Sequence, residues 1–135
     1  MTDATKPLRQ LIEAVYLKTV SQELNWSFNP ADDSCTAQLG PGAVEIVQET
    51  DEDGDYYSYA QIRNSQNEVV DTIYGGSLGR GSKPFNTGHK DYWELLRDLR
   101  SQAYRSAMGT DKIVSGMLAE LNAVSLPLDE DDVPF

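Results

Sequence analysis

The sequence predicts an α+β domain with an N-terminal helix, a four-stranded antiparallel meander and two C-terminal helices packed on one face of the sheet. Apolar residues recur at helical spacing before Trp26, at a period of two from there to Tyr74, and at helical spacing again after Asp91. Short stretches rich in Gly, Asp and Asn join the expected strands and favour antiparallel hairpins. A run of strands flanked by helices is typical of the α+β class.

The first helix is expected in the segment TKPLRQLIEAVYLKTVSQEL. Its apolar stripe consists of Leu8, Leu11, Ile12 and Val15. Thr5 is available as the N-cap. Pro7 is tolerated because the amides of the first turn have no partner within the helix.

The period-two region predicts four strands, at residues 34–39, 43–49, 56–64 and 68–74. The connectors LGPGA, DEDGD and SQN have the composition of tight turns, so we expect each strand to pair with the next. Residues 75–90, GGSLGRGSKPFNTGHK, show no periodicity and are expected to form a flexible loop.

Two helices are expected after this loop. Asp91 is placed to cap the first, whose apolar stripe is Tyr92, Leu95, Leu96, Leu99, Ala103 and Ala107. Gly109 ends it and Thr110 caps the second, whose stripe is Ile113, Val114, Met117, Leu118 and Leu121. The order of helix, Trp26, meander and YWELLRDLRSQAYRSAMGTDKIVSGMLAEL resembles small uncharacterised bacterial α+β domains, which implies a fold and no activity.

Length and composition indicate one domain over residues 1–124 and a flexible acidic tail over 125–135. A chain of 135 residues can bury a core without disulfides, and Cys35 is the only cysteine. The net charge of −11, from 22 acidic and 11 basic residues, argues against broad binding of duplex DNA. No secretory signal or membrane-length apolar run is present, so we expect a cytoplasmic protein with no membrane partner.

Three patterns resemble catalytic or ligand-binding motifs but lack the context that the chemistry needs. GGSLG has the spacing of a nucleophile elbow around Ser77, but the chain continues as a loop, which also holds the only histidine, His89. GSLGRGSK resembles a P-loop, but its lysine follows the serine and Pro84 prevents a helix. ETDEDGDYYSYA alternates carboxylates as an EF-hand loop does, with Ala60 where the bidentate glutamate belongs. The sequence therefore predicts no enzyme, no metal site and no cofactor.

The most informative stretch is the C-terminal sequence DEDDVPF. It consists of Asp129, Glu130, Asp131 and Asp132, followed by Val133, Pro134 and Phe135. A tail that only aids solubility explains the carboxylates but not the apolar residues after them. A terminal Phe135 can place its ring in an apolar pocket while its α-carboxylate pairs with Arg or Lys at the rim. Pro134 lowers the ordering cost, and the acidic residues steer the peptide to a basic surface. A docking peptide is therefore expected, with folding of Phe135 back onto its own domain as an alternative.

DEDDVPF resembles the acidic C-terminal tip of bacterial single-stranded DNA-binding proteins. The resemblance implies that residues 129–135 bind the replication, recombination and repair proteins that recognise such tips. The rest of the chain departs from that family, because only NAVSLP precedes the tip in place of a long linker and no five-stranded barrel is evident. The sequence therefore favours a non-enzymatic adaptor, or a competitor for the same receptors, on a different fold.

A second hypothesis is a single-stranded DNA-binding protein on a non-barrel fold. Its candidate contacts are the basic residues Arg80, Lys83, Lys90, Arg97 and Arg100, with aromatic residues between Tyr56 and Trp93 as stacking surfaces. In this hypothesis the acidic tail competes with DNA for the groove. A third and weaker idea is an inhibitor whose carboxylates imitate DNA phosphates. The sequence leaves the oligomeric state open, with a dimer among the alternatives.

Overall fold

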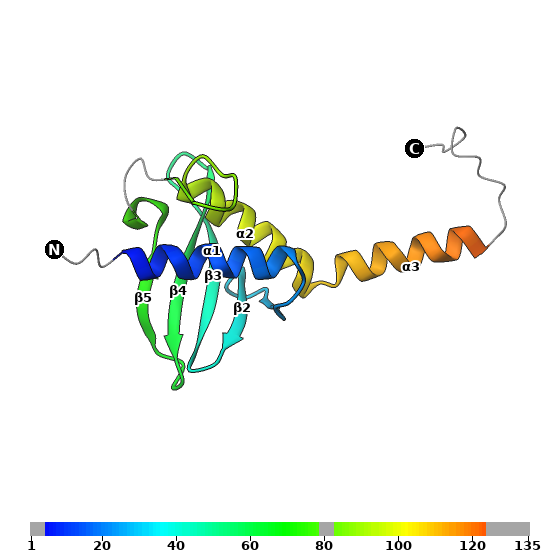
Figure 1. The fold of residues 1–135 in the computed structure, drawn as a ribbon, viewed down its shortest axis with the longest axis horizontal. Helices are drawn as coiled ribbons and strands as arrows, with labels where there is room; N and C mark the ends of the chain where they lie inside the picture. The colour runs from blue at the N-terminus through cyan, green and yellow to red at the C-terminus, as the bar shows by residue number, and fades with distance from the viewer. Residues whose placement is uncertain (1–4, 79–82, 124–135) are drawn as a thin grey trace.

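The computed structural model describes residues 5–78 and 83–123, and it has the α+β architecture that the sequence predicts (Figure 1). The helices are α1 (Lys6–Val20), α2 (Tyr92–Ala107) and α3 (Thr110–Ala123), with a 3-10 turn, η1 (Gly75–Leu78), after the sheet. The strands are β1 (Ser27–Asn29), β2 (Ser34–Leu39), β3 (Gly42–Thr50), β4 (Tyr56–Asn64) and β5 (Val69–Ile73). The predicted tail at 125–135 lies outside the described residues.

The sheet has five antiparallel strands in sequence order, so the prediction of a four-stranded meander was wrong by one strand. The additional strand is β1, which pairs Ser27 with Thr36 and Asn29 with Ser34. Its three residues are too few for a period-two pattern to stand out in the sequence. β1 and β5 form the two edges of this open sheet.

The turns of the meander follow from local residue chemistry. Asp51 closes the β3–β4 turn by accepting hydrogen bonds from the amides of Asp53 (2.9 Å) and Asp55 (3.0 Å). This is an Asx-type turn, so the acidic stretch is the charged hairpin that its strand-like flanks predict. At the β2–β3 turn, a Cβ at Gly42 would collide with the carbonyl oxygen of Arg63 on β4, which requires glycine there.

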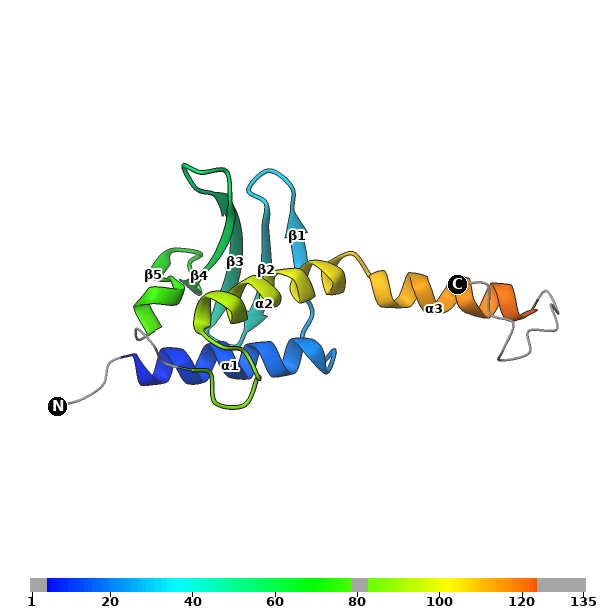
Figure 2. The same ribbon diagram turned by 90° about the horizontal axis from the view of Figure 1, so that it is seen from above.

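The core lies between one face of the sheet and the helices α1 and α2, which run side by side over that face (Figure 2). Leu95, Leu96 and Leu99 of α2 are fully buried, and each contributes roughly 1.5–3 kcal/mol of hydrophobic stabilisation. They meet Ile12 and Val15 of α1 and the sheet residues Cys35, Ala37, Val44, Ile46, Ala60 and Ile73. Asp91 caps α2 as predicted, accepting a hydrogen bond from the Glu94 amide at 2.8 Å.

The helix α3 is placed differently from the prediction that both C-terminal helices cover the sheet. It leaves the end of α2 and extends away from the domain (Figure 1), and every side chain from Asp111 to Asn122 is exposed. The change of direction occurs at Gly109, whose φ of 66° ends α2. The core is therefore complete without α3, which leaves the apolar side of this helix uncovered.

Candidate functional site

The exposed apolar side of α3 is the first candidate surface. We call it the α3 stripe: Ile113, Val114, Met117, Leu118 and Leu121. The exposed fractions of these residues lie between 44% and 61%, which is far above the values of the apolar residues in the core. Large apolar side chains gathered on one exposed face mark interaction sites more often than single exposed ones do.

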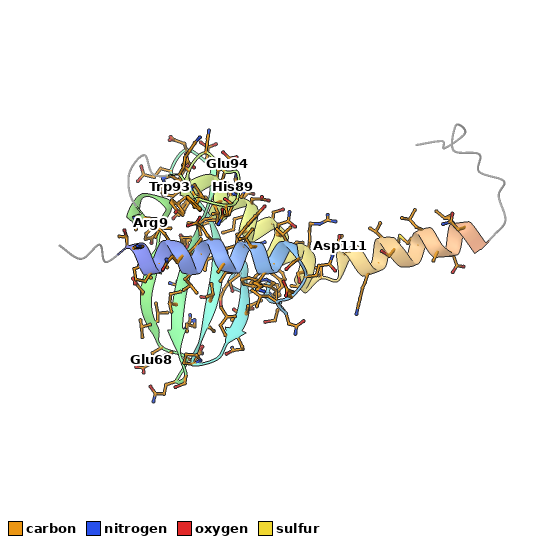
Figure 3. The ribbon with its side chains drawn as sticks, in the orientation of Figure 1. Arg9, Glu68, His89, Trp93, Glu94 and Asp111 are labelled. Atoms are coloured by element: carbon orange, nitrogen blue, oxygen red, sulfur yellow. The ribbon has the colours of Figure 1, made fainter. Side chains whose placement is uncertain are left out.

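The base of α3 is fixed to the domain by polar contacts. Asp111, which Figure 3 shows where α3 joins the domain, pairs with Arg105 of α2 at 2.7 Å and accepts a hydrogen bond from the Gln22 side chain at 3.3 Å. Beside these contacts is a hollow of about 470 Å³ between the ends of α1 and α2 and the start of α3, with Val20 and Met108 in its wall. These contacts join the start of α3 to α2 and to the residue pair that follows α1.

The predicted partner-binding residues, Asp129, Glu130, Asp131, Asp132, Val133, Pro134 and Phe135, lie outside the described residues. The described chain ends with α3 at Ala123. The segment that contains the predicted docking peptide therefore follows a helix that extends away from the core (Figure 1).

The structure places the basic residues predicted to contact nucleic acid in different surroundings. Arg80 lies outside the described residues. Lys83, Lys90 and Arg97 are exposed. Arg100 is only 6% exposed, and its guanidinium pairs with Asp33 and lies over the rings of Phe28 (5.6 Å) and Tyr104 (5.3 Å). Arg100 therefore joins α2 to the β1–β2 turn and does not belong to an exposed basic surface.

Two of these basic residues share a small hollow with aromatic side chains. Lys90 and Arg97 line a space of about 200 Å³ together with Tyr56 and Trp93. Trp93, labelled in Figure 3, is 45% exposed and Tyr56 is 69% exposed, so both rings are accessible. Asp91 and Glu94 line the same hollow, so acidic side chains accompany the two basic ones.

The other aromatic residues proposed as stacking surfaces differ widely in their exposure. Tyr59 is 8% exposed, and Tyr92 is 2% exposed and donates a hydrogen bond to Glu13 at 3.1 Å. Burial, together with the hydrogen bond to Glu13, raises the pKa of Tyr92 to about 12. Phe85 is the opposite case, because its ring is 88% exposed.

His89 is buried at the centre of a partly buried polar cluster that the sequence did not indicate. Its Nε2 lies 2.9 Å from Asp98 Oδ2 and its Nδ1 lies 2.7 Å from the Thr87 hydroxyl. The Tyr16 hydroxyl donates to the same Asp98 oxygen at 2.7 Å. Burial raises the pKa of Asp98, but hydrogen bonds from His89, Tyr16 and Gln102 outweigh it and leave the pKa below its usual value. The cluster fastens the end of the 83–90 loop to α1 and α2.

This cluster lacks the features of a hydrolase site. Ser77, the serine of the GGSLG pattern, lies in the turn η1, where its hydroxyl accepts a hydrogen bond from the Tyr74 amide at 3.3 Å. A nucleophile elbow instead places the serine between a strand and a helix. Within the described residues, no group of three or more His, Cys, Asp or Glu side chains is arranged to hold a metal ion.

The fold and its surfaces define a small α+β domain with an exposed amphipathic C-terminal helix. Comparisons with protein-family models, curated proteins and solved structures find no match to this chain. None of the helices in the described part of the chain is both long and apolar enough to span a membrane.

Proposed function

We propose that this chain is a non-enzymatic adaptor whose C-terminal segment docks onto DNA replication and repair proteins. The receptors are proteins that recognise the tails of bacterial single-stranded DNA-binding proteins, which DEDDVPF resembles. The observation that carries the proposal is the placement of α3. Its 14 residues extend the chain by about 21 Å from the end of α2, so the described chain ends at Ala123, well away from the folded core (Figure 1).

The chemistry of the peptide fits a pocket that is apolar inside and basic at its rim. The Phe135 ring supplies apolar area, and its α-carboxylate, if free, supplies a charge that Arg or Lys can bind. The upstream carboxylates raise the association rate with a basic surface. The net charge of −11 adds to this long-range attraction.

Affinity capture from a bacterial lysate, with mass-spectrometric identification, tests the proposal. The tagged chain is compared with a variant that lacks Pro134 and Phe135, and with a matched Leu126→Ala variant that changes an apolar residue outside the tip. The wild type and the Leu126→Ala variant should recover replication and repair proteins, and the truncated variant should not. Equal recovery by all three chains would defeat the proposal.

The free carboxylate has a separate test. Two glycines added after Phe135 keep the ring but move the terminal charge about 7 Å further along an extended chain. Capture should then fall at least tenfold, because ring and carboxylate no longer enter one pocket together. Unchanged capture by the extended chain would remove the carboxylate from the proposal and leave only the ring.

One observation favours single-stranded DNA binding as a second candidate function. Lys90 and Arg97 share a hollow with the accessible rings of Tyr56 and Trp93, which is the combination that holds a phosphate beside a stacked base. Polarisation of a labelled oligo-dT at low salt is the test. This function requires salt-sensitive binding that a Lys90→Glu/Arg97→Glu double variant loses. The adaptor function predicts no such binding.

A further inference from the structure

We infer that α3 is a second docking element, whose stripe enters an apolar groove with a basic rim on the same protein that binds DEDDVPF. This inference rests on the proposed adaptor function and adds a requirement to it. The partner must carry a groove for an amphipathic helix close to its pocket for the peptide.

The spacing of the α3 stripe is that of a helix bound in a groove. Val114, Met117, Leu118 and Leu121 stand at positions i, i+3, i+4 and i+7. These are the anchor positions by which an amphipathic helix lies in a hydrophobic groove. All four side chains are substantially exposed, so they are available without unfolding the domain.

The length and composition of α3 also favour a covered helix. Helices shorter than about 12–15 residues are marginal in water, and most of their stability in proteins comes from packing. The α3 helix has 14 residues, with Gly116 in its interior and Ile113 and Val114 in its first half. Glycine inside a helix is destabilising relative to alanine, and β-branched residues are destabilising to a smaller extent. Packing of the stripe against a partner offsets these costs.

Charge and area together favour a groove on another protein over a second copy of this chain. One border of the stripe carries the exposed carboxylate of Glu120, one heptad after Ile113. On the other border the charge of Asp111 is already paired with Arg105, and Lys112 lies on the opposite side of the helix. Two copies would bring their Glu120 carboxylates onto one interface between chains of net charge −11, whereas a basic rim complements Glu120.

The exposed fractions of the five stripe residues correspond to roughly 400 Å² of apolar surface, the size of an interaction patch on a monomer. Two such stripes packed together would bury about 800 Å², less than the roughly 1,200 Å² of the smallest stable specific interfaces. A groove encloses the helix on three sides and adds its walls to the interface. The area therefore fits a concave partner better than a flat pairing of two copies.

The distance along the chain limits where the two sites lie on the partner. Residues 124–128 separate the end of α3 from Asp129. Even fully extended, this stretch spans at most about 20 Å. The groove must therefore lie within about 20 Å of the site that receives Asp129, and within about 40 Å of the pocket for Phe135, which lies six residues further along the chain. Linking two sites over so short a distance gives a high effective concentration for the second contact, so each element strengthens the other.

The experiment uses a purified bacterial protein with an established pocket for single-stranded DNA-binding protein tails as the probe. Its dissociation constant is measured by calorimetry for the full chain, for Met117→Lys, for Ala119→Lys and for the chain without Pro134 and Phe135. Ala119 lies on the opposite side of α3, so Ala119→Lys adds the same charge to the same exposed helix outside the stripe. Met117→Lys should weaken binding 10-fold to 100-fold, and Ala119→Lys should change it less than twofold.

The possible failures are distinguishable. If the wild type binds and the Met117→Lys variant binds equally well, the inference about α3 is overturned and the adaptor function still stands. Absence of binding by every chain defeats the adaptor function and the inference with it. Light scattering at about 100 µM must show a monomer; a dimer that Met117→Lys dissociates would assign the stripe to a second copy and overturn the inference.

Discussion

Replacing Asp33 by asparagine tests the assignment of Arg100 to the domain interior. The change removes the charge opposite the Arg100 guanidinium but keeps an acceptor oxygen, and asparagine tolerates the φ of 51° at this position. The Arg100 side chain is 7% exposed and that of Asp33 is 48% exposed. Breaking a fully buried ion pair lowers the free energy of unfolding by about 3–5 kcal/mol, and breaking a surface pair lowers it by at most about 1 kcal/mol. This pair is intermediate in burial, so we expect Asp33→Asn to lower the free energy of unfolding by about 2 kcal/mol.

Urea unfolding followed by tryptophan fluorescence measures this cost, because the buried Trp26 becomes exposed on unfolding. At roughly 4 °C per kcal/mol for a domain of this size, the melting temperature should fall by about 8 °C. In an Arg100→Met background, which keeps an apolar chain against Phe28 and Tyr104, Asp33→Asn should cost less than about 0.5 kcal/mol. The same cost in both backgrounds would refute the reasoning, because the loss would then not come from the pair.

Three further predictions concern stability. The pKa of Asp98 is lowered in the folded state, so its ionised carboxylate stabilises the fold above its ordinary pKa of 3.8. This stabilisation is lost as the pH falls below that value. In the Asp98→Asn variant the free energy of unfolding should therefore depend less steeply on pH in this range, as acid unfolding curves would show. Burial and the hydrogen bond to Asp98 raise the pKa of Tyr16 from 10.0 to about 12, so the free energy of unfolding should fall as the pH rises through this range. Urea titrations at alkaline pH should show a smaller fall in the Tyr16→Phe variant. Leu96→Ala should cost about 3 kcal/mol in urea unfolding, whereas Met117→Lys should change the melting temperature by less than about 2 °C, because Leu96 is buried and Met117 is exposed.

Periodicity and turn chemistry predicted most of the fold. β2 and β4 have their predicted bounds, and β3 and β5 differ from theirs by one residue at each end. The missed strand β1 has only three residues and owes its strand conformation to pairing with β2, which is a tertiary contact. Cys35, expected on a strand, is fully buried on β2, and burial raises the pKa of its thiol.

The placement of side chains and of α3 was less predictable. An apolar stripe has the same spacing whether it covers its own sheet or faces solvent, so the exposure of Met117 and its neighbours follows only from the arrangement of the whole domain. From the sequence, Arg100 was predicted to be an exposed cation. It is buried because the chain around the β1–β2 turn places Asp33 and Phe28 against it. His89 and Asp98 meet because a loop folds over α2, and no local sequence signal marks that contact.

Competition for a tail pocket tests the central claim most directly. A labelled tail peptide of a single-stranded DNA-binding protein is bound to its purified receptor, and the unlabelled chain is added while fluorescence polarisation is followed. The account predicts that the wild-type chain displaces the peptide and that the chain without Pro134 and Phe135 does not. Failure of the wild type to displace it, or equal displacement by both chains, would contradict the account.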